Sequence, residues 1–104
     1  MVTALVQIKI IKPLSRQKVQ ELASKSAPRY RPVPGLIRKY YILSEDGKTA
    51  GGVYLWKSRG DGEQFYTEEW KKHLEEIYGS KPSITYFQSY VVVDNKIGEI
   101  VEED

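Results

Sequence analysis

The sequence contains no cysteine and only one histidine. The absence of cysteine excludes disulfide frameworks, thiolate zinc sites, iron–sulfur clusters and cysteine nucleophiles together. Any acid–base chemistry that uses an imidazole must use His73. A metal site would have to be built from carboxylates, and none cluster inside the predicted strands, so we expect no metal.

Long hydrophobic runs are also missing. The apolar start, Val2–Ile11, is interrupted by Gln7 and Lys9 and does not have the pattern of a signal peptide. A composition of 40% hydrophobic and 29% charged residues is typical neither of a disordered chain nor of a membrane-spanning one. We therefore expect a cytoplasmic protein that makes no membrane contact. Its 104 residues predict a single domain over 1–104 with a core of its own.

The near-neutral net charge of +2 hides an asymmetry along the chain. Residues 1–40 hold nine basic side chains and one acid, Glu21, whereas residues 41–104 hold seven basic and thirteen acidic ones. The tail, residues 96–104, is acidic, and we expect it to be mobile unless it docks on a partner. Because the two parts of the sequence neutralise one another, within or between chains, the asymmetry is weak support for nucleic-acid binding.

Period-two alternation of apolar residues predicts four strands, at 2–11, 36–43, 50–56 and 84–93. A turn at 45–48, with the sequence Glu-Asp-Gly-Lys, joins the second and third strands as a hairpin. The third strand contains two adjacent glycines, which weaken a strand unless a bulge or a close backbone approach requires them.

Helical periodicity predicts one helix from the N-cap Ser15 to about Ala27 and a second over Asp61–Tyr78. Thr67 is a second N-cap inside the latter helix, so we expect a kink or restart there, and Gly79 ends it. Residues 28–35 contain three prolines and one glycine, which predict a rigid loop that is neither helix nor strand.

The order strand, helix, strand, strand, helix, strand predicts a ferredoxin-like α+β fold, with a four-stranded antiparallel sheet and two helices on one of its faces. The other face stays uncovered. We expect it to expose aromatic side chains from three strands, Tyr54 and Trp56 together with Tyr41 and Tyr86. A contiguous patch of that kind marks an interface or a binding surface.

Two nucleotide-related motifs fail on inspection. Asp46–Thr49 imitates the end of a phosphate-binding loop, but Ile42 stands where that motif needs glycine, and a strand rather than a helix follows. A βαββαβ chain could also be an RNA-recognition domain. With Tyr54 at the central aromatic position, Ala50 and Gly52 stand where that signature has a basic and an aromatic residue. We therefore do not expect a nucleic-acid partner.

His73 lies on the apolar stripe of the second helix, between Trp70 and Ile77. A lone histidine in such a place is more often a hydrogen-bonded packing residue than a catalytic base, so both interpretations stay open. Phe65 and Trp70 are most simply core residues, although they cannot share one narrow helical stripe.

Arg38 and Lys39 are neighbours on the second strand and must point to opposite faces. We place Lys39 together with Tyr41 on the aromatic face that the helices leave uncovered, because Leu36 best fits the helix side. On that face Lys39 could fix an anionic oxygen of a ligand.

Four ordered motifs carry a resemblance to a known family: PGLIRKYY at 34–41, TAGGVYLW at 49–56, FYTEEW at 65–70 and ITYF at 84–87. Together they resemble the YdhR-type mono-oxygenase family of the dimeric α+β barrel superfamily, over residues 34–95. One departure is the Gly-Asp-Gly at 60–62, where such proteins carry better helix formers.

The resemblance implies a homodimer in which two sheets face each other with their uncovered sides inward. It also implies a pocket in each protomer between sheet and helices. Tyr54 and Trp56 would line this pocket, and the strand glycines would leave room for a ligand or a neighbouring strand. Further candidate ligand contacts are Gln7, Lys39, Tyr41, Phe65, Trp70 and Tyr86.

The function that the resemblance implies is oxidation of an electron-rich aromatic such as a phenol or quinol by O₂, without flavin, metal or any other cofactor. His73 would then be the proton acceptor and Tyr54 a hydrogen-bond donor to the developing oxyanion. The alternative is a non-catalytic dimeric binder of a small hydrophobic ligand. Haem degradation, another activity of the superfamily, pairs a helix histidine with an asparagine on the first strand, where this chain has Gln7, and ranks lower.

Overall fold

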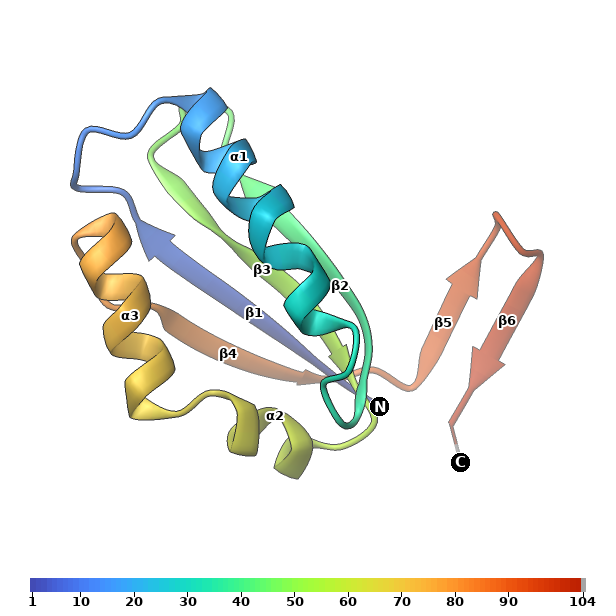
Figure 1. The fold of residues 1–104 in the computed structure, drawn as a ribbon. Coiled ribbons are helices and arrows are strands. Elements are labelled where there is room, and N and C mark those ends of the chain that lie inside the picture. The colour runs from blue at the N-terminus through green and yellow to red at the C-terminus, as the bar shows by residue number, and fades with distance from the viewer. Residues whose placement is uncertain (104) are drawn as a thin grey trace.

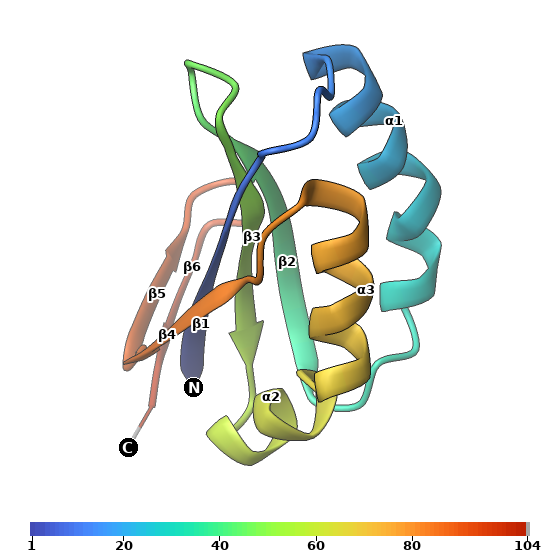
Figure 2. The ribbon, with the colours of Figure 1, turned by 90° about the vertical axis from the view of Figure 1, so that its left-hand side faces the viewer.

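Four antiparallel strands form the central sheet of the computed structural model, which describes residues 1–103, in the order β2-β3-β1-β4. The strands are β1 (Val2–Lys9), β2 (Leu36–Leu43), β3 (Thr49–Trp56) and β4 (Ser83–Gln88). The helices α1 (Arg16–Ser26), α2 (Arg59–Phe65) and α3 (Glu68–Tyr78) all lie on one face of this sheet (Figure 1, Figure 2). The predicted ferredoxin-like α+β fold is therefore confirmed.

The predicted helix boundaries follow from local capping. The Ser15 hydroxyl accepts a hydrogen bond from the Lys18 amide, and the Thr67 hydroxyl accepts one from the Trp70 amide, so α1 and α3 both begin after a side-chain cap. The restart at Thr67 divides the second helical region into α2 and α3. Gly79 ends α3 with φ of 94°, a conformation that glycine adopts without strain.

The proline-containing loop differs from expectation at its start. Residues Ala27–Tyr30 form a short 3₁₀ helix, η1, that continues directly from α1. Pro28 is compatible with this because a proline in the first turn of a helix removes an amide that has no partner there anyway. As a result Tyr30 is carried over the sheet instead of pointing away with the loop.

The C-terminal part of the chain also differs from expectation. The predicted strand over 84–93 is interrupted after Gln88, and β5 (Val91–Asp94) leaves the sheet to pair with β6 (Glu99–Glu102). This hairpin lies on the side of the sheet opposite the helices (Figure 2). Asp94 anchors it through an ion pair with Arg38 at 2.6 Å. The predicted mobile tail is thus partly an ordered strand.

The largest correction concerns the aromatic face of the sheet. Tyr54 and Trp56 are 2% and 0% exposed and point toward the helices, not toward the uncovered face. Tyr41, which pairs with Gly52, and Tyr86, which pairs with Ala4, lie on the same helix-facing side, so their predicted exposure on the uncovered face is also wrong. Ala4 pairs with Tyr54 across β1 and β3, so the aliphatic side of β1 and the aromatic side of β3 form one buried face. The uncovered face carries the other register, which includes Tyr40 on β2 and Phe87 on β4, each 52% exposed.

Candidate functional site

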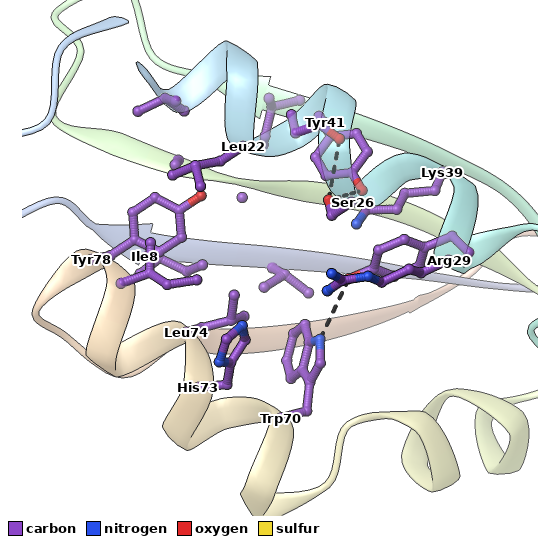
Figure 3. A pocket seen from close by; sticks show the side chains of 18 of the residues that line it. Ile8, Leu22, Ser26, Arg29, Lys39, Tyr41, Trp70, His73, Leu74 and Tyr78 are labelled. Carbon is purple, nitrogen blue, oxygen red and sulfur yellow. Dashed lines mark hydrogen bonds between the residues drawn. The ribbon is translucent and has the colours of Figure 1, made fainter. Parts of the chain in front are cut away.

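A cavity of about 490 Å³ lies between the sheet and the helices (Figure 3). Strands β1, β2 and β3 form its floor, α1 and η1 form one wall, and α3 forms the other. Its lining is mostly aliphatic and aromatic, and its volume falls within the range of roughly 300–1,000 Å³ that is typical of small-molecule sites.

Six of the nine side chains predicted from the sequence line this cavity: His73, Tyr54, Lys39, Tyr41, Phe65 and Trp70. They come from four elements that are distant in the sequence, since β2, β3, α2 and α3 each contribute at least one. The other three, Gln7, Trp56 and Tyr86, do not line it.

The three excluded residues lie elsewhere for separate reasons. Gln7 is exposed and pairs with Gly51, so its side chain points to the uncovered face of the sheet. Trp56 is fully buried in the core behind the cavity, where its indole Nε1 donates a hydrogen bond to Tyr66 Oη at 3.1 Å. Tyr86 lies under the guanidinium of Arg59, 4.4 Å from its ring centroid.

Lys39 is brought onto the cavity side by an irregularity in β2. Its register against β3 shifts between Leu36 and Arg38, so Leu36 and Lys39 share a face although they are three positions apart. The prediction for Leu36 is confirmed, whereas the prediction that Lys39 and Tyr41 lie on the uncovered face is wrong, because strand parity does not hold across this irregularity. Gly52 on β3, which pairs with Tyr41, leaves room for the lysine stem, because a Cβ at Gly52 would lie 3.3 Å from Lys39 Cε.

Three tyrosine rings surround the amine of Lys39. Its Nζ lies 3.3 Å from the ring centroid of Tyr30, 3.7 Å from that of Tyr41 and 4.7 Å from that of Tyr54. The ring faces attract a cation, but they replace only part of its lost hydration. Burial lowers the pKa of Lys39 from 10.5 to about 7, so the amine exchanges its proton near neutral pH.

The tyrosines of the site are held in their neutral form. Burial raises the pKa of Tyr54 far above its ordinary value of 10.0, and it raises the pKa values of Tyr41 and Tyr78 as well. These hydroxyls can therefore donate hydrogen bonds at neutral pH but cannot serve as proton acceptors in phenolate form. The hydroxyl of Tyr41 is already hydrogen bonded to Ser26 Oγ at 2.7 Å.

His73 lies beside Trp70 and Leu74 on the cavity side of α3 (Figure 3). Its side chain is exposed, which places it at the rim and not in the core. The sequence left open whether His73 is a packing residue or a catalytic base. Its position at the rim is compatible with the second, because a side chain there can contact a ligand and solvent at once.

Several lining residues were missed from the sequence. Tyr30 and Arg29 come from η1, and Ser26 comes from the last turn of α1. Tyr30 contacts five other groups of the site. Its hydroxyl accepts a hydrogen bond from Trp70 Nε1 at 3.5 Å, and its ring packs on the Lys39 amine and on the rings of Tyr41, Tyr54 and Phe65. The i, i+4 spacing of Leu22, Ser26 and Tyr30 was the available signal, but the proline at 28 hid it.

Two further features of the described residues concern metal-ligand clusters and membrane-spanning helices. Within 1–103, no three His, Asp or Glu side chains come close enough together to hold a metal ion. None of the helices in this part of the chain has the length and apolar character needed to cross a bilayer.

Comparison with solved structures identifies proteins of the same fold. A mono-oxygenase from the ActVA-Orf6 gene of Streptomyces coelicolor, in complex with nanaomycin D, is 21% identical, with a TM-score of 0.65 and 89% of this chain and 90% of that chain covered. A protein of unknown function from Nitrosomonas europaea is 12% identical, with a TM-score of 0.66 and coverages of 85% and 87%. SnoaB, a cofactor-independent oxygenase from Streptomyces nogalater, is 12% identical, with a TM-score of 0.63 and coverages of 88% and 95%. At these identities the likeness establishes the fold.

Sequence comparison extends this result to the family. No curated protein matches the sequence. The profile of one family, described as "Putative mono-oxygenase ydhR", matches residues 5–95, which run from β1 into the turn after β5. Because this match covers most of the 104 residues, the chain belongs to the YdhR-type mono-oxygenase family.

Proposed function

We propose that the protein is a cofactor-independent mono-oxygenase that oxidises an electron-rich, phenol- or quinol-like aromatic in the cavity between sheet and helices. The observation that carries the proposal is the cavity itself, about 490 Å³ lined by Tyr54, Phe65 and Trp70, with His73 at its rim. Membership of the family and the activities of the two Streptomyces proteins of the same fold support the reaction class.

In this reaction the protein has to supply little more than substrate binding and proton transfer. Deprotonation of the substrate gives an anion that can donate an electron to O₂, and recombination followed by loss of water yields a carbonyl. For a substrate with an activated CH₂ group, as in an anthrone, the CH₂ group and one O₂ become a C=O group and one water. No external reductant is then needed, so the residues must bind the substrate, exclude water and move protons.

The side chains of the cavity divide these roles. His73 at the rim accepts the proton that the substrate releases, and its exposure lets that proton pass to solvent. Tyr54 on the floor is a neutral donor toward the developing oxyanion, because its raised pKa keeps the phenol protonated. Phe65 and Trp70 present ring surfaces to a planar substrate.

The first prediction concerns oxygen uptake. With anthrone as substrate, we expect O₂ consumption above the background rate with heat-denatured protein. His73→Ala should lower kcat about 100-fold or more, since general-base catalysis typically contributes 10²–10⁴-fold. Tyr54→Phe should lower it by roughly 100-fold through loss of an oxyanion donor. An oxygen electrode measures both effects.

The matched control for His73 is Lys72→Ala, an exposed neighbour on α3 that does not line the cavity and should leave kcat unchanged. If anthrone and simple quinols give no uptake above background, the mono-oxygenase proposal fails. If uptake occurs and His73→Ala leaves it intact, the reaction stands but the role of His73 is wrong.

We further propose that two copies associate through the uncovered face of the sheet. This face carries Tyr40 and Phe87, each 52% exposed, and the β5–β6 hairpin beside it exposes Val93 and Ile100 to 60% and 67%. Apolar surface of this extent on one side of a small domain is typical of an interface. A homodimer buries it symmetrically, since each copy presents the same face.

The second prediction tests this assembly by sedimentation equilibrium across a dilution series. We expect a mass of twice the 12.0 kDa of the chain. Tyr40→Glu should shift the equilibrium to monomer, because it places a charge in the apolar contact. Ile11→Glu is the matched control: Ile11 is 68% exposed but packs beside Gly79 at the other side of the fold. A monomeric wild-type protein would overturn the proposed dimer.

The alternative function is a dimeric binder of a small hydrophobic ligand without catalysis. One observation favours it: the imidazole of His73 is at the exposed rim, and the hydroxyls on the floor are not available as bases. Tight binding of an aromatic ligand with no oxygen uptake, unaffected by His73→Ala, would establish this alternative.

A further inference from the structure

The charge of the cavity lining is of one sign. Its charged side chains are Lys25 from α1, Arg29 from η1 and Lys39 from β2, and no Asp or Glu of the described residues contributes to it. The chain as a whole has 14 acidic side chains against 16 basic ones, so this segregation is not a consequence of composition. A largely apolar pocket with only cationic groups attracts and orients an anion.

Lys39 is partly buried, whereas Lys25 and Arg29 are exposed, and Lys39 has no carboxylate partner. The ion pairs in residues 1–103 join Arg38 to Asp94, Arg59 to Glu63, Lys71 to Glu68 and the amino terminus to Glu103. No hydrogen bond to the Lys39 amine is present in the same part of the chain, and the rings of Tyr30, Tyr41 and Tyr54 lie around it. A buried amine in this state gains a large stabilisation from any anionic oxygen that reaches it.

We propose that the ligand of this cavity is a planar aromatic anion, and that the amine of Lys39 pairs with its charged oxygen while the rings of Trp70 and Phe65 pack on its plane. The proposal rests on the proposed function only in that the cavity binds an aromatic molecule; it is independent of the reaction with O₂. Arg29 and Lys25 at the cavity wall add long-range attraction for the same charge.

Binding is then coupled to proton uptake. Near neutral pH the unliganded Lys39 loses its proton readily, because burial has lowered its pKa to about 7. A bound anion favours the ammonium form and raises that pKa again. Above pH 7 the complex must therefore take up a proton that the free protein lacks, and the affinity falls roughly tenfold per pH unit until the pKa of the complex is reached.

Other titratable and charged groups face Lys39, and their contributions to the pH dependence must be distinguished from that of Lys39. Tyr30, Tyr41, Tyr54 and Tyr78 lie on η1, β2, β3 and α3 around the cavity, Lys25 and Arg29 are its other cations, and His73 faces it from α3. The raised pKa values of Tyr41, Tyr54 and Tyr78 keep these phenols neutral. His73 also faces the cavity, so it needs its own variant.

The experiment compares two probes of the same shape, 9-anthracenecarboxylate and 9-anthracenemethanol, by fluorescence titration between pH 6 and 9. We expect the wild-type protein to bind the carboxylate at least tenfold more tightly than the alcohol at pH 6.5. This preference should weaken roughly tenfold per pH unit above 7, while the affinity for the neutral alcohol stays constant. Calorimetry in buffers of different ionisation enthalpy should show uptake of one proton at pH 8.

Three variants test whether Lys39 causes the preference for the carboxylate and its pH dependence. Lys39→Met should remove the preference for the carboxylate, and Lys39→Arg should keep it without the pH dependence, because a guanidinium stays charged over this range. Lys72→Gln, exposed and outside the cavity, should behave as wild type. Thermal melts of each variant establish that it is folded before the titrations are compared.

The proposal is overturned if the two probes bind equally, if neither binds, or if Lys39→Met keeps the preference. It is also overturned if His73→Gln, and not Lys39→Arg, abolishes the pH dependence. These outcomes are independent of turnover. A carboxylate preference without any oxygen uptake would leave this inference standing and end the mono-oxygenase proposal, whereas uptake with neutral substrates and no preference would do the reverse.

Discussion

Replacing Gly51 with alanine is expected to lower the free energy of unfolding by about 3 kcal/mol or more. A Cβ at this position would lie 1.8 Å from the carbonyl oxygen of Val6 and 2.8 Å from its carbonyl carbon, both in the backbone of β1. No rotation of a side chain can relieve such a contact, so β1 and β3 must move apart at the centre of the sheet. Urea unfolding followed by tryptophan fluorescence measures the loss.

The matched control is Gly60→Ala. Gly60 lies in α2, and the nearest atom to an added Cβ is Ser58 Oγ at 3.8 Å, which is an ordinary contact. Because glycine is a poor helix former, this variant should be unchanged or more stable by up to about 1 kcal/mol. If the free energy of unfolding of Gly51→Ala lies within about 1 kcal/mol of the wild-type value, the close approach of the two strands in this structure is wrong.

The order of elements could be predicted from the sequence because local signals agree with one another. Alternation located the four strands of the main sheet, and the caps at Ser15, Thr67 and Gly79 located the helix ends. The β5–β6 hairpin could not be found in this way. The apolar run over 84–93 continues through the break after Gln88, so nothing in its pattern indicates that the chain leaves the sheet there.

The faces of the sheet could be predicted only in part. Alternation shows that Tyr54 and Trp56 share a face, but Val53 and Leu55 make the opposite face of β3 apolar as well, so the pattern does not say which face the helices cover. The aliphatic side of β1 indicates which face this is. Pairing Ala4 with Tyr54 puts the small residue of β1 against the large one of β3, which is how a close-packed interior is filled.

The candidate site was predicted only in part, because strand parity fails at the irregularity in β2. Parity places Lys39 and Tyr41 on the face opposite Leu36, but the register shift between Leu36 and Arg38 turns both toward the helices. The environment of Lys39 does not follow, because it depends on Tyr30, which η1 carries over the sheet from a proline-rich segment. The sequence therefore predicts the lysine as a contact for an anion, which stays a prediction, but gives no sign of the cause of its lowered pKa.

The second large effect is expected for Trp56, which the family resemblance placed in the ligand pocket and the structure places behind it. Trp56→Ala should destabilise the fold by about 3–5 kcal/mol, because it removes a fully buried indole. The ring stacks on Tyr54 at 5.9 Å between centroids and packs on Phe65 and Tyr66, each at 5.7 Å. Gly62 of α2 lies against it too, where an added Cβ would be 3.3 Å from the indole. Urea unfolding followed by circular dichroism measures this loss without depending on the removed fluorophore.

The variant Trp56→Phe distinguishes two roles of Trp56, a core residue that supports the cavity from behind and a residue that contacts the ligand. This variant keeps a buried ring but leaves the Tyr66 hydroxyl without its 3.1 Å donor, so we expect a loss of about 1–2 kcal/mol. A double-mutant cycle with Tyr66→Phe should return a coupling of about 1 kcal/mol for that hydrogen bond. Because Tyr54 and Phe65 still line the cavity in this variant, the affinity for 9-anthracenecarboxylate should stay within about twofold of wild type. A tenfold weaker affinity at unchanged stability would instead make Trp56 a ligand contact, as the family resemblance implied.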